Sequence, residues 1–244
     1  MRKSTFSGLF ISAIVVLIIF QSCKNDAYLT TPLPVPDQSF SEEFDTTTAA
    51  LSRGWKFINA SDPVGPGVWQ QGGSIPPWFN SYSNNGNAAG FIGADYTSTS
   101  AGSATISNWV VSPLITMQNG DKIVFYTRAL LYDIGGGDST DFGNSLQVRI
   151  NTLNQSTNVG LGLDPGDFTT GLLAINGNFD YYSVLHPVST AYPARWTRFE
   201  ATVFGLDKPV KGRFAFRYFV IDGGSAGNGS GVGIDKVTYT SVNH

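Results

Sequence analysis

The stretch GRFAFRYFVI, residues 212–221, carries the strongest strand signal in the sequence. Phe214, Phe216 and Tyr218 occur at every second position, and alternate side chains of a strand point to the same face of a sheet. Aromatic and β-branched residues also favour strands over helices. We therefore expect a strand that places one aromatic face in a hydrophobic core.

Further segments of the same kind follow one another along the chain, separated by turn signals such as Asn119-Gly120 and Gly223-Gly224. They are residues 104–117, 121–131, 144–151, 195–204 and 231–242. Helix patterns are almost absent, and the sequence shows no long internal repeat of the kind that builds a propeller or solenoid. The sequence therefore predicts an all-β fold, a jelly-roll β-sandwich of about ten to twelve mostly antiparallel strands.

The composition agrees with one large β domain. There are 28 glycines, aromatic residues make up 13% of the chain and charged residues only 14%, which suits short strands joined by polar turns. The formal net charge is −3, and loss of Arg2 and Lys3 with a targeting segment leaves 13 of the 15 basic residues against 18 acidic ones. We therefore expect no nucleic-acid partner, because such a partner requires a basic surface.

The N-terminus, MRKSTFSGLFISAIVVLIIFQSC, has a basic start, a short apolar run and the only cysteine. The apolar run is too short to span a bilayer comfortably, so residues 1–22 are predicted to be a secretory signal peptide. FQSC resembles a bacterial lipobox, although two of its residues depart from the usual ones. This resemblance implies that Cys23 is lipidated. The Pro-rich tether of residues 23–37 then links this anchor to a jelly-roll binding domain of residues 38–244.

The expected localisation is therefore the outer membrane, as a lipoprotein exposed at the cell surface that contacts the membrane through its lipid anchor alone. The alternative is a free Cys23 at the end of an uncleaved anchor. A single cysteine also excludes an internal disulfide.

Two motifs, NWVVSP at 108–113 and GIDKV at 233–237, stand within a series of strand-like segments that runs from Phe40 to Tyr239. This series resembles the cleaved-adhesin or choice-of-anchor J domains of bacterial surface proteins, which are similar in shape to MAM-type jelly rolls. The resemblance implies a jelly-roll binding or adhesion module that contains a structural calcium ion and no catalytic machinery.

Two acidic residues occupy strand positions that predict burial. FSEEF (40–44) places Glu42 between two phenylalanines, and at strand spacing Asp235 shares a face with Val237 and Tyr239. Two buried carboxylates repel each other unless a cation lies between them, and Ca²⁺ prefers such oxygen ligands. We predict a structural Ca²⁺ bound by Glu42 and Asp235, which the family resemblance also implies. The open alternative is a register shifted by one residue, in which both acids face solvent.

Further calcium ligands are predicted to come from Asn59, Asp62 and Asn87. A second cluster of acids in DIGGGDSTDFGN (133–144) suggests another calcium site. Its candidate ligands are Asp133, Asp138 and Asp141, together with Asn144. The spacing does not match an EF-hand loop, so the alternative is a solvated hairpin loop.

Catalytic patterns are weak. GGSAG (223–227) fits the G-x-S-x-G pattern around Ser225, but that pattern requires a strand followed by a helix, and here another strand follows. The only histidines are His186 and His244. A pair of carboxylates also has the chemistry of a glycosidase, but the apolar neighbours of Glu42 and Asp235 indicate an interior rather than a cleft. We therefore expect that the protein is not an enzyme.

The ligand-binding prediction rests on the aromatic segment VWQQGGSIPPWFNSYSNNGN (68–87), and on Trp78, Phe79 and Tyr82 in particular. Exposed aromatic side chains on loops provide flat, rigid surfaces for sugar rings or for protein partners. The favoured hypothesis is a surface-anchored, non-catalytic carbohydrate-binding or adhesion module that recognises a glycan or a surface protein. The alternative is a structural or assembly lipoprotein of the envelope that binds protein partners, and a polysaccharide hydrolase is the third hypothesis.

Overall fold

The computed structural model describes residues 34–83 and 87–242. The chain divides into two compact units, Met1–Val35 and Pro36–His244, and every described helix and strand belongs to the second. The predicted signal peptide and Cys23 lie outside the described residues. Within the described part, no helix has the length and apolar character needed to cross a membrane.

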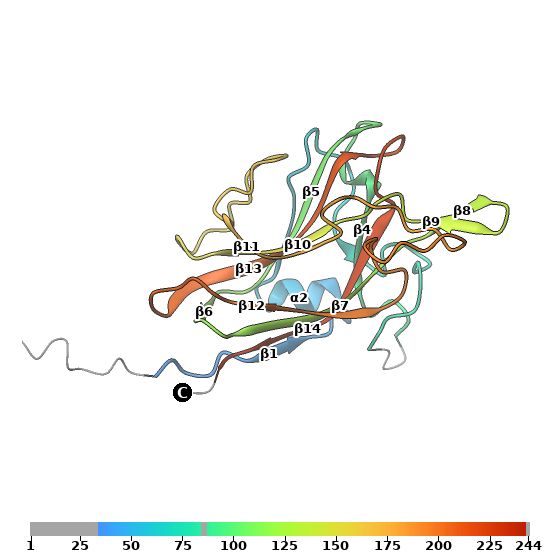
Figure 1. Ribbon diagram of the computed structural model, residues 1–244. Helices are drawn as coiled ribbons and strands as arrows, with labels where there is room; N and C mark the ends of the chain where they lie inside the picture. Colours follow the sequence, from blue (N-terminus) through green and yellow to red (C-terminus); the bar gives the residue numbers. More distant parts are fainter. Residues whose placement is uncertain (1–33, 84–86, 243–244) are drawn as a thin grey trace, which may run out of the picture. The chain divides into compact units, whose positions relative to one another are not determined.

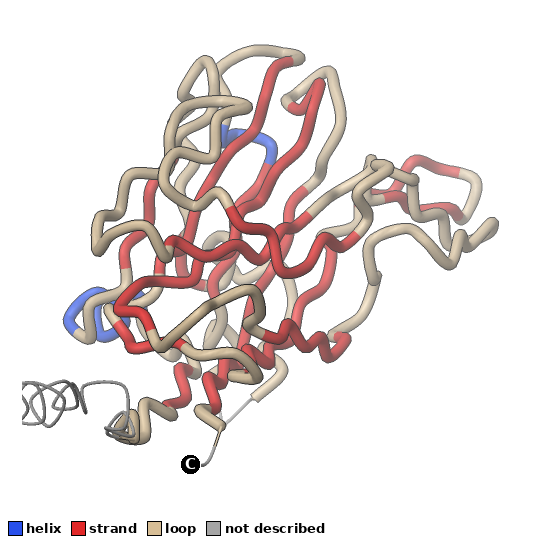
Figure 2. The backbone as a smooth tube through the Cα atoms, turned by 60° about the vertical axis from the view of Figure 1, so that its left-hand side comes forward, coloured by secondary structure: helices blue, strands red, loops and turns tan. Residues whose placement is uncertain are grey.

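The regular elements of the second unit are mostly strands joined by long loops, and the described residues also form one six-residue α-helix and one short 3₁₀ helix (Figure 2). The elements are β1 (Phe40–Glu42), α2 (Thr47–Ser52), β2 (Lys56–Asn59), β3 (Gln70–Gln71), β4 (Ile92–Asp95), η2 (Tyr96–Ser98), β5 (Ala104–Val111), β6 (Ile115–Met117), β7 (Lys122–Ala129), β8 (Tyr132–Gly135), β9 (Asp138–Thr140), β10 (Leu146–Asn151), β11 (Thr170–Ile175), β12 (Thr197–Thr202), β13 (Val210–Gly223) and β14 (Gly231–Thr240).

Twelve of these strands form two six-stranded sheets, and β8 and β9 form a separate hairpin. Sheet A has the order β12-β7-β14-β4-β3, with β1 also paired to β14. Sheet B has the order β11-β10-β13-β5-β2, with β6 also paired to β13. In Figure 1, β10, β11 and β13 of sheet B lie above β7 and β14 of sheet A, and the β8–β9 hairpin projects to one side. All strand pairs are antiparallel, so the predicted all-β sandwich is confirmed.

The segment predicted to be the central strand is confirmed as part of β13. Phe214, Phe216 and Tyr218 are fully buried between the sheets. The opposite face of β13 is covered as well, because Arg217 is only 2% exposed. Its guanidinium lies 4.0 Å from the ring centroid of Phe219 and 4.9 Å from that of Trp109, which belongs to a second, smaller hydrophobic cluster. The centre of β13 is therefore buried on both faces.

The first and last strands are neighbours in sheet A. Phe40 on β1 pairs with Tyr239 on β14, and the two rings stack with centroids 5.9 Å apart. Phe214 from sheet B stacks on the same Tyr239 ring at 5.9 Å. Figure 1 shows β1 and β14 side by side, and the ring contacts join both ends of the folded chain to the core.

A β-bulge interrupts β14. The register with β7 shifts between Asp235 and Thr238, and Lys236 has a positive φ of 48°. Ile234 before the bulge and Val237 after it both lie in the core, although their positions differ by three and regular alternation would place them on opposite faces. Asp235 therefore does not share a face with Val237. The sequence-based expectation that it did was wrong, because the extra residue of the bulge changes the alternation.

Candidate functional site

An open groove of about 840 Å³ lies where loops from several strands meet. One side is formed by Tyr96 of η2, Tyr132 of β8, Phe142 after β9 and Tyr181 in the connection between β11 and β12. The other side is the glycine-rich connection of residues 224–229 between β13 and β14. Such a concave surface lined by aromatic side chains is a candidate for a binding site.

The aromatic side chains of this groove form a continuous row. The ring centroids of Tyr96 and Tyr132 lie 6.5 Å apart, those of Tyr132 and Phe142 6.3 Å, and those of Phe142 and Tyr181 6.4 Å. Tyr132 is 38% exposed and Tyr181 is 50% exposed, so the row presents aromatic surface to solvent. We refer to these four residues as the aromatic row.

Polar groups stand opposite the aromatic row. The hydroxyl of Tyr181 donates a hydrogen bond of 2.5 Å to the Oδ1 atom of Asn228, which fixes the tyrosine across the groove. Asp222 is exposed and has a left-handed backbone with φ of 54°. Its carboxylate has no side-chain hydrogen bond or ion pair within the described residues. The groove therefore combines apolar ring surface with the exposed carboxylate of Asp222.

Local burial keeps the Tyr132 hydroxyl neutral. Burial raises the pKa of Tyr132, and the neighbouring Tyr96 and Asp95 act in the same direction. Burial also raises the pKa of Asp95, against the effect of hydrogen bonds from Thr97. A neutral phenol both donates and accepts hydrogen bonds, so Tyr132 offers the groove both functions.

The first predicted calcium ligand, Glu42, is 1% exposed and already has a cationic partner. Its carboxylate forms a bidentate pair with Arg53, at 2.8 Å from Nε to Oε2 and 2.5 Å from Nη2 to Oε1. The amide of Phe44 donates a further hydrogen bond of 3.0 Å. The guanidinium of Arg53 therefore supplies the positive charge that was predicted to come from a calcium ion.

The second predicted ligand, Asp235, belongs to a different network. Its carboxylate accepts hydrogen bonds from the amides of Tyr82, Ser83 and Lys236, at 2.8, 3.0 and 2.6 Å. Burial raises the pKa of Asp235 to about 6, against the effect of these N–H donors. Because Glu42 and Asp235 each have separate partners, the arrangement does not fit a calcium ion held between them. The calcium itself stays a prediction.

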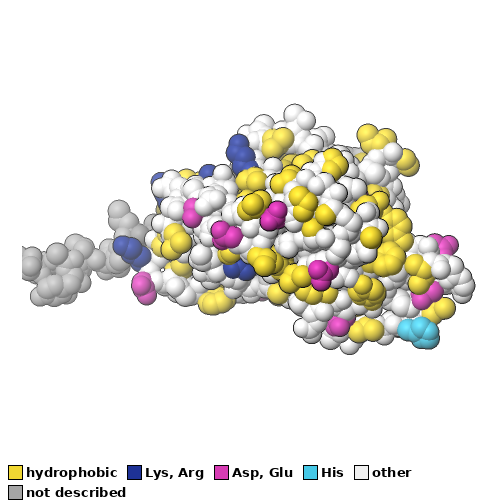
Figure 3. Space-filling model, turned by 90° about the horizontal axis from the view of Figure 1, so that it is seen from above, with side chains coloured by type: hydrophobic (Ala, Val, Ile, Leu, Met, Phe, Trp, Pro, Cys, Tyr) yellow, Lys and Arg dark blue, Asp and Glu magenta, His cyan; other side chains and the backbone are white. Residues whose placement is uncertain are grey.

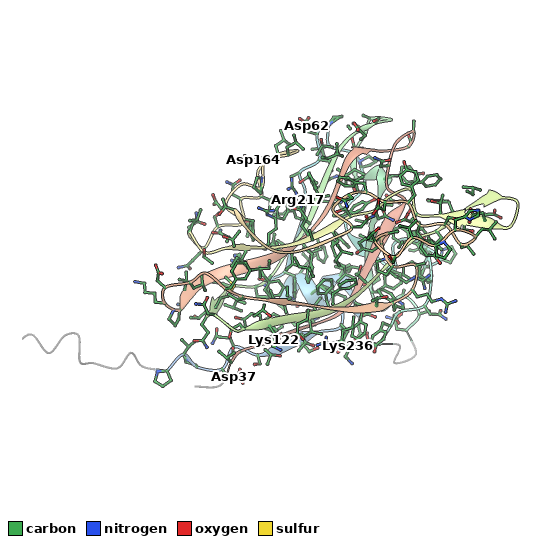
Figure 4. The ribbon with its side chains drawn as sticks, viewed as in Figure 1. Asp37, Asp62, Lys122, Asp164, Arg217 and Lys236 are labelled. Carbon is green, nitrogen blue, oxygen red and sulfur yellow. The ribbon has the colours of Figure 1, made fainter. Side chains whose placement is uncertain are left out.

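The additional predicted ligands are also apart from one another. The Asn59 amide donates to the carbonyls of Gly67 and Ser98, at 2.7 Å each, and so braces a turn. Figure 4 places Asp62 and Lys236, the neighbour of Asp235, at opposite edges of the domain.

Asn87 is exposed and lies near the start of α2. Its amide donates a hydrogen bond of 3.1 Å to the carbonyl of Asp45. The structure thus brings Asn87 toward the segment that follows β1, and does not join it to Asn59 or Asp62.

Each acid of the predicted second calcium cluster accepts hydrogen bonds from backbone amides. Asp133 caps its own hairpin by accepting the amide of Gly135 at 2.8 Å. Asp138 accepts the amide of Val184 at 2.9 Å, and buried Asp141 accepts that of Tyr182 at 2.8 Å.

Asn144, the fourth member of this cluster, is also buried and accepts the hydroxyl of Tyr218 at 2.9 Å. In the residues that the structure describes, no three His, Cys, Asp or Glu side chains gather closely enough to hold a metal ion.

The predicted ligand-binding aromatics cover the outer face of sheet A, and only one of them is exposed. Trp78 packs into space left by glycines, since a Cβ on Gly93 would come within 2.5 Å of its ring. Phe79 stacks on Phe91 with centroids 4.7 Å apart. Tyr82 is 42% exposed. The expectation that Trp78 offers a flat exposed surface therefore does not match its half-buried position.

Tyr82 stacks on Tyr126 with centroids 3.6 Å apart. This pair lies outside the groove lining, so the molecule presents two separate sets of exposed tyrosines. Trp78, Phe79 and Tyr82 were predicted from the sequence to bind a ligand. Of these, Tyr82 is exposed enough to remain a candidate.

The sequence motif around Ser225 lies in the groove but lacks the parts of a hydrolase. Ser225 is in the exposed connection between β13 and β14, and β14 rather than a helix follows it, as expected. Among the described residues that line the groove, none is a histidine. His186, the histidine within the described residues, is held by a hydrogen bond of 3.0 Å from its amide to Ser183 in a loop elsewhere.

No protein-family model and no curated protein sequence matches this chain. Among solved structures, the fold is similar to the K1 cleaved adhesin domain of Lys-gingipain from Porphyromonas gingivalis W83, with a TM-score of 0.51 and 18% identity over 84% of this chain and 99% of that chain. The K3 cleaved adhesin domain of the same protein gives a TM-score of 0.50 and 15% identity, over 86% and 100% of the two chains. The described domain thus has a β-sandwich fold similar to that of cleaved adhesin domains.

Proposed function

We propose that this protein is a non-catalytic binding module that recognises a glycan in the groove of the aromatic row. The observation that carries the proposal is the row itself, with Tyr132 and Tyr181 exposed along an open groove. The C–H faces of sugar rings are apolar and pack well on aromatic rings. Asp222 and Asn228 stand opposite and can accept or donate hydrogen bonds to sugar hydroxyls.

The similarity in fold to cleaved adhesin domains supports a role in adhesion, and the lipobox-like sequence before Cys23 supports anchoring in the outer membrane. The proposed lipoprotein presents the groove at the cell surface.

The experiment is native gel retardation by soluble neutral polysaccharides such as xylan, galactan and β-glucan, followed by titration with the oligosaccharide of any that retards the protein. Tyr181→Ala removes the most exposed ring of the row. It is expected to weaken binding roughly tenfold, because one aromatic contact contributes about 1–1.5 kcal/mol.

Tyr82→Ala is the matched control, since Tyr82 is exposed to a similar degree but lies outside the groove. Loss of retardation in Tyr181→Ala alone supports the groove as the glycan-binding site. Loss in Tyr82→Ala alone would overturn it in favour of the site predicted from the sequence. Absence of retardation by every polysaccharide, with an envelope protein copurifying instead, would support the alternative of a protein-binding lipoprotein.

A further inference from the structure

A second cavity, of about 600 Å³, contains two arginines. It is lined by Arg128 at the end of β7, by Arg195 and Trp196 just before β12, and by Leu131, Tyr182 and Val184 from neighbouring loops. It is distinct from the groove, although the adjacent pairs Leu131/Tyr132 and Tyr181/Tyr182 each contribute one residue to each site. We call it the arginine pocket.

Arg128 is held in place without an anionic partner. Its guanidinium lies 4.1 Å from the ring centroid of Phe79. Its Nε atom is buried and has no hydrogen-bond partner among the described residues. A buried donor without an acceptor is unfavourable, and the described residues also provide no hydrogen bond or ion pair to the rest of the Arg128 guanidinium.

The charges around the pocket are not balanced by the chain. Burial lowers the pKa of Arg128, and repulsion from Arg195 acts in the same direction. Within the described part of the chain, the ion pairs join Arg53 to Glu42 and join Lys122 and Arg198 to Glu200. None involves Arg128 or Arg195.

The carboxylates on adjoining segments are already occupied. Asp141 accepts the amide of Tyr182 at 2.8 Å, and Asp138 accepts that of Val184 at 2.9 Å. Acidic side chains are scattered over the face seen in Figure 3, where basic ones are sparse. In a chain with more acidic than basic residues, two adjacent arginines without a carboxylate are therefore an exception that points to an anionic ligand.

The rest of the lining indicates the size and shape of that ligand. The Trp196 indole is fixed by a hydrogen bond of 2.8 Å from its Nε1 to the carbonyl of Asn80 and by edge contact with Phe79, at 5.3 Å between centroids. Leu131 and Val184 add apolar surface. A cavity of this volume with an aromatic wall is larger than a bare inorganic anion requires, and it suits a ring that carries a charged group.

We propose that the arginine pocket binds the carboxylate of a uronic acid residue in an acidic glycan, with Arg128 and Arg195 on the carboxylate and Trp196 beside the sugar ring. The planar guanidinium matches a carboxylate in geometry and forms paired hydrogen bonds with it. This inference goes beyond the proposed function, because it concerns a separate site and does not require the aromatic row.

The test is titration of the purified full chain with trigalacturonate, with binding measured by isothermal titration calorimetry. Galactotriose is the neutral counterpart. Arg195→Gln is the main variant because Arg195 is exposed, so its loss should not disturb folding. Arg195→Gln and Arg128→Gln are each expected to weaken trigalacturonate binding at least tenfold. Arg198→Gln, which removes an exposed arginine three residues away that is already paired with Glu200, is the matched control and is expected to change binding less than twofold.

Two further measurements separate this site from the groove and from simple anion binding. Tyr181→Ala is expected to leave trigalacturonate binding unchanged; if it abolishes that binding while Arg195→Gln does not, the acidic sugar binds in the groove and the inference fails. It also fails if inorganic sulfate at equal concentration displaces trigalacturonate fully, since the pocket would then recognise a bare anion. Failure to bind trigalacturonate at all would overturn it, whatever the result with neutral glycans.

Discussion

Replacement of Arg53 by alanine should destabilise the domain strongly, because it leaves the Glu42 carboxylate buried without its cation. Glu42 is 1% exposed, whereas Arg53 is 50% exposed. Removal of one partner from a fully buried ion pair costs about 3–5 kcal/mol. Water can reach the outer half of the guanidinium site, and the amide of Phe44 still donates to Glu42. We therefore expect a loss of about 2–3 kcal/mol.

For a domain of this size, such a loss corresponds to a decrease of roughly 4–12 °C in Tm. The assay is urea denaturation at pH 7 of the wild type, Arg53→Ala, Glu42→Gln and the double variant. Glu42→Gln keeps an acceptor for Phe44 and removes the buried charge, so the double variant should recover part of the stability lost in Arg53→Ala. Lys122→Ala, which breaks an exposed pair with Glu200, is the control and should cost less than about 1 kcal/mol.

The same measurement tests the predicted calcium ion. Each protein is unfolded once with millimolar Ca²⁺ and once with chelator. If Arg53 is the partner of Glu42, the chelator should leave the free energy of unfolding of the wild type unchanged. The reasoning is refuted if the free energy of unfolding of Arg53→Ala stays within about 0.5 kcal/mol of that of the wild type. It is also refuted if the chelator alone lowers the free energy of unfolding of the wild type as much as the substitution does.

Three other outcomes are expected. Gly93→Ala should destabilise the domain by about 1–3 kcal/mol, because the new Cβ would lie 2.5 Å from Trp78; a shift in tryptophan fluorescence checks it, and an unchanged Tm would contradict it. The free energy of unfolding of Asp95→Asn should rise relative to that of the wild type when the pH is raised from 3.5 to 7. Its pKa is raised by burial, so the wild type loses stability as pH rises from 3.8 through the folded-state pKa, and urea curves at the two pH values measure this. Cys23→Ala should release the protein from membranes, which fractionation of cells detects.

The strands were predictable from the sequence because their alternation is a local property. Val210–Gly223 and Gly231–Thr240 both correspond closely to the predicted segments, since aromatic and β-branched residues between glycine-rich turns require no knowledge of distant contacts. The face on which Asp235 lies was not predictable in this way. The bulge at Lys236 depends on how β14 meets β7, and composition carries no sign of it.

The aromatic row could not be predicted from the sequence for a similar reason, because it depends on contacts between distant segments. The aromatic row is assembled from four separate segments, with Tyr96 in η2, Tyr132 in β8, and Phe142 and Tyr181 in connections. The signal that a sequence could have provided is a bulky aromatic within or beside a polar or glycine-rich segment, as with Tyr132 beside DIGGGD and Tyr181 in NFDYYS. Trp78 carries the same signal, but glycines distant in sequence accommodate its ring. Local composition does not distinguish the two cases.

The pairing of β1 with β14 bears on how the domain would respond to mechanical tension. β14 begins at Gly231, next to the groove, and its far end pairs with β1, the first strand after the predicted tether. A pull between a bound ligand and an N-terminal anchor would thus act on opposite ends of two antiparallel strands. Their hydrogen bonds would be sheared together rather than unzipped in turn.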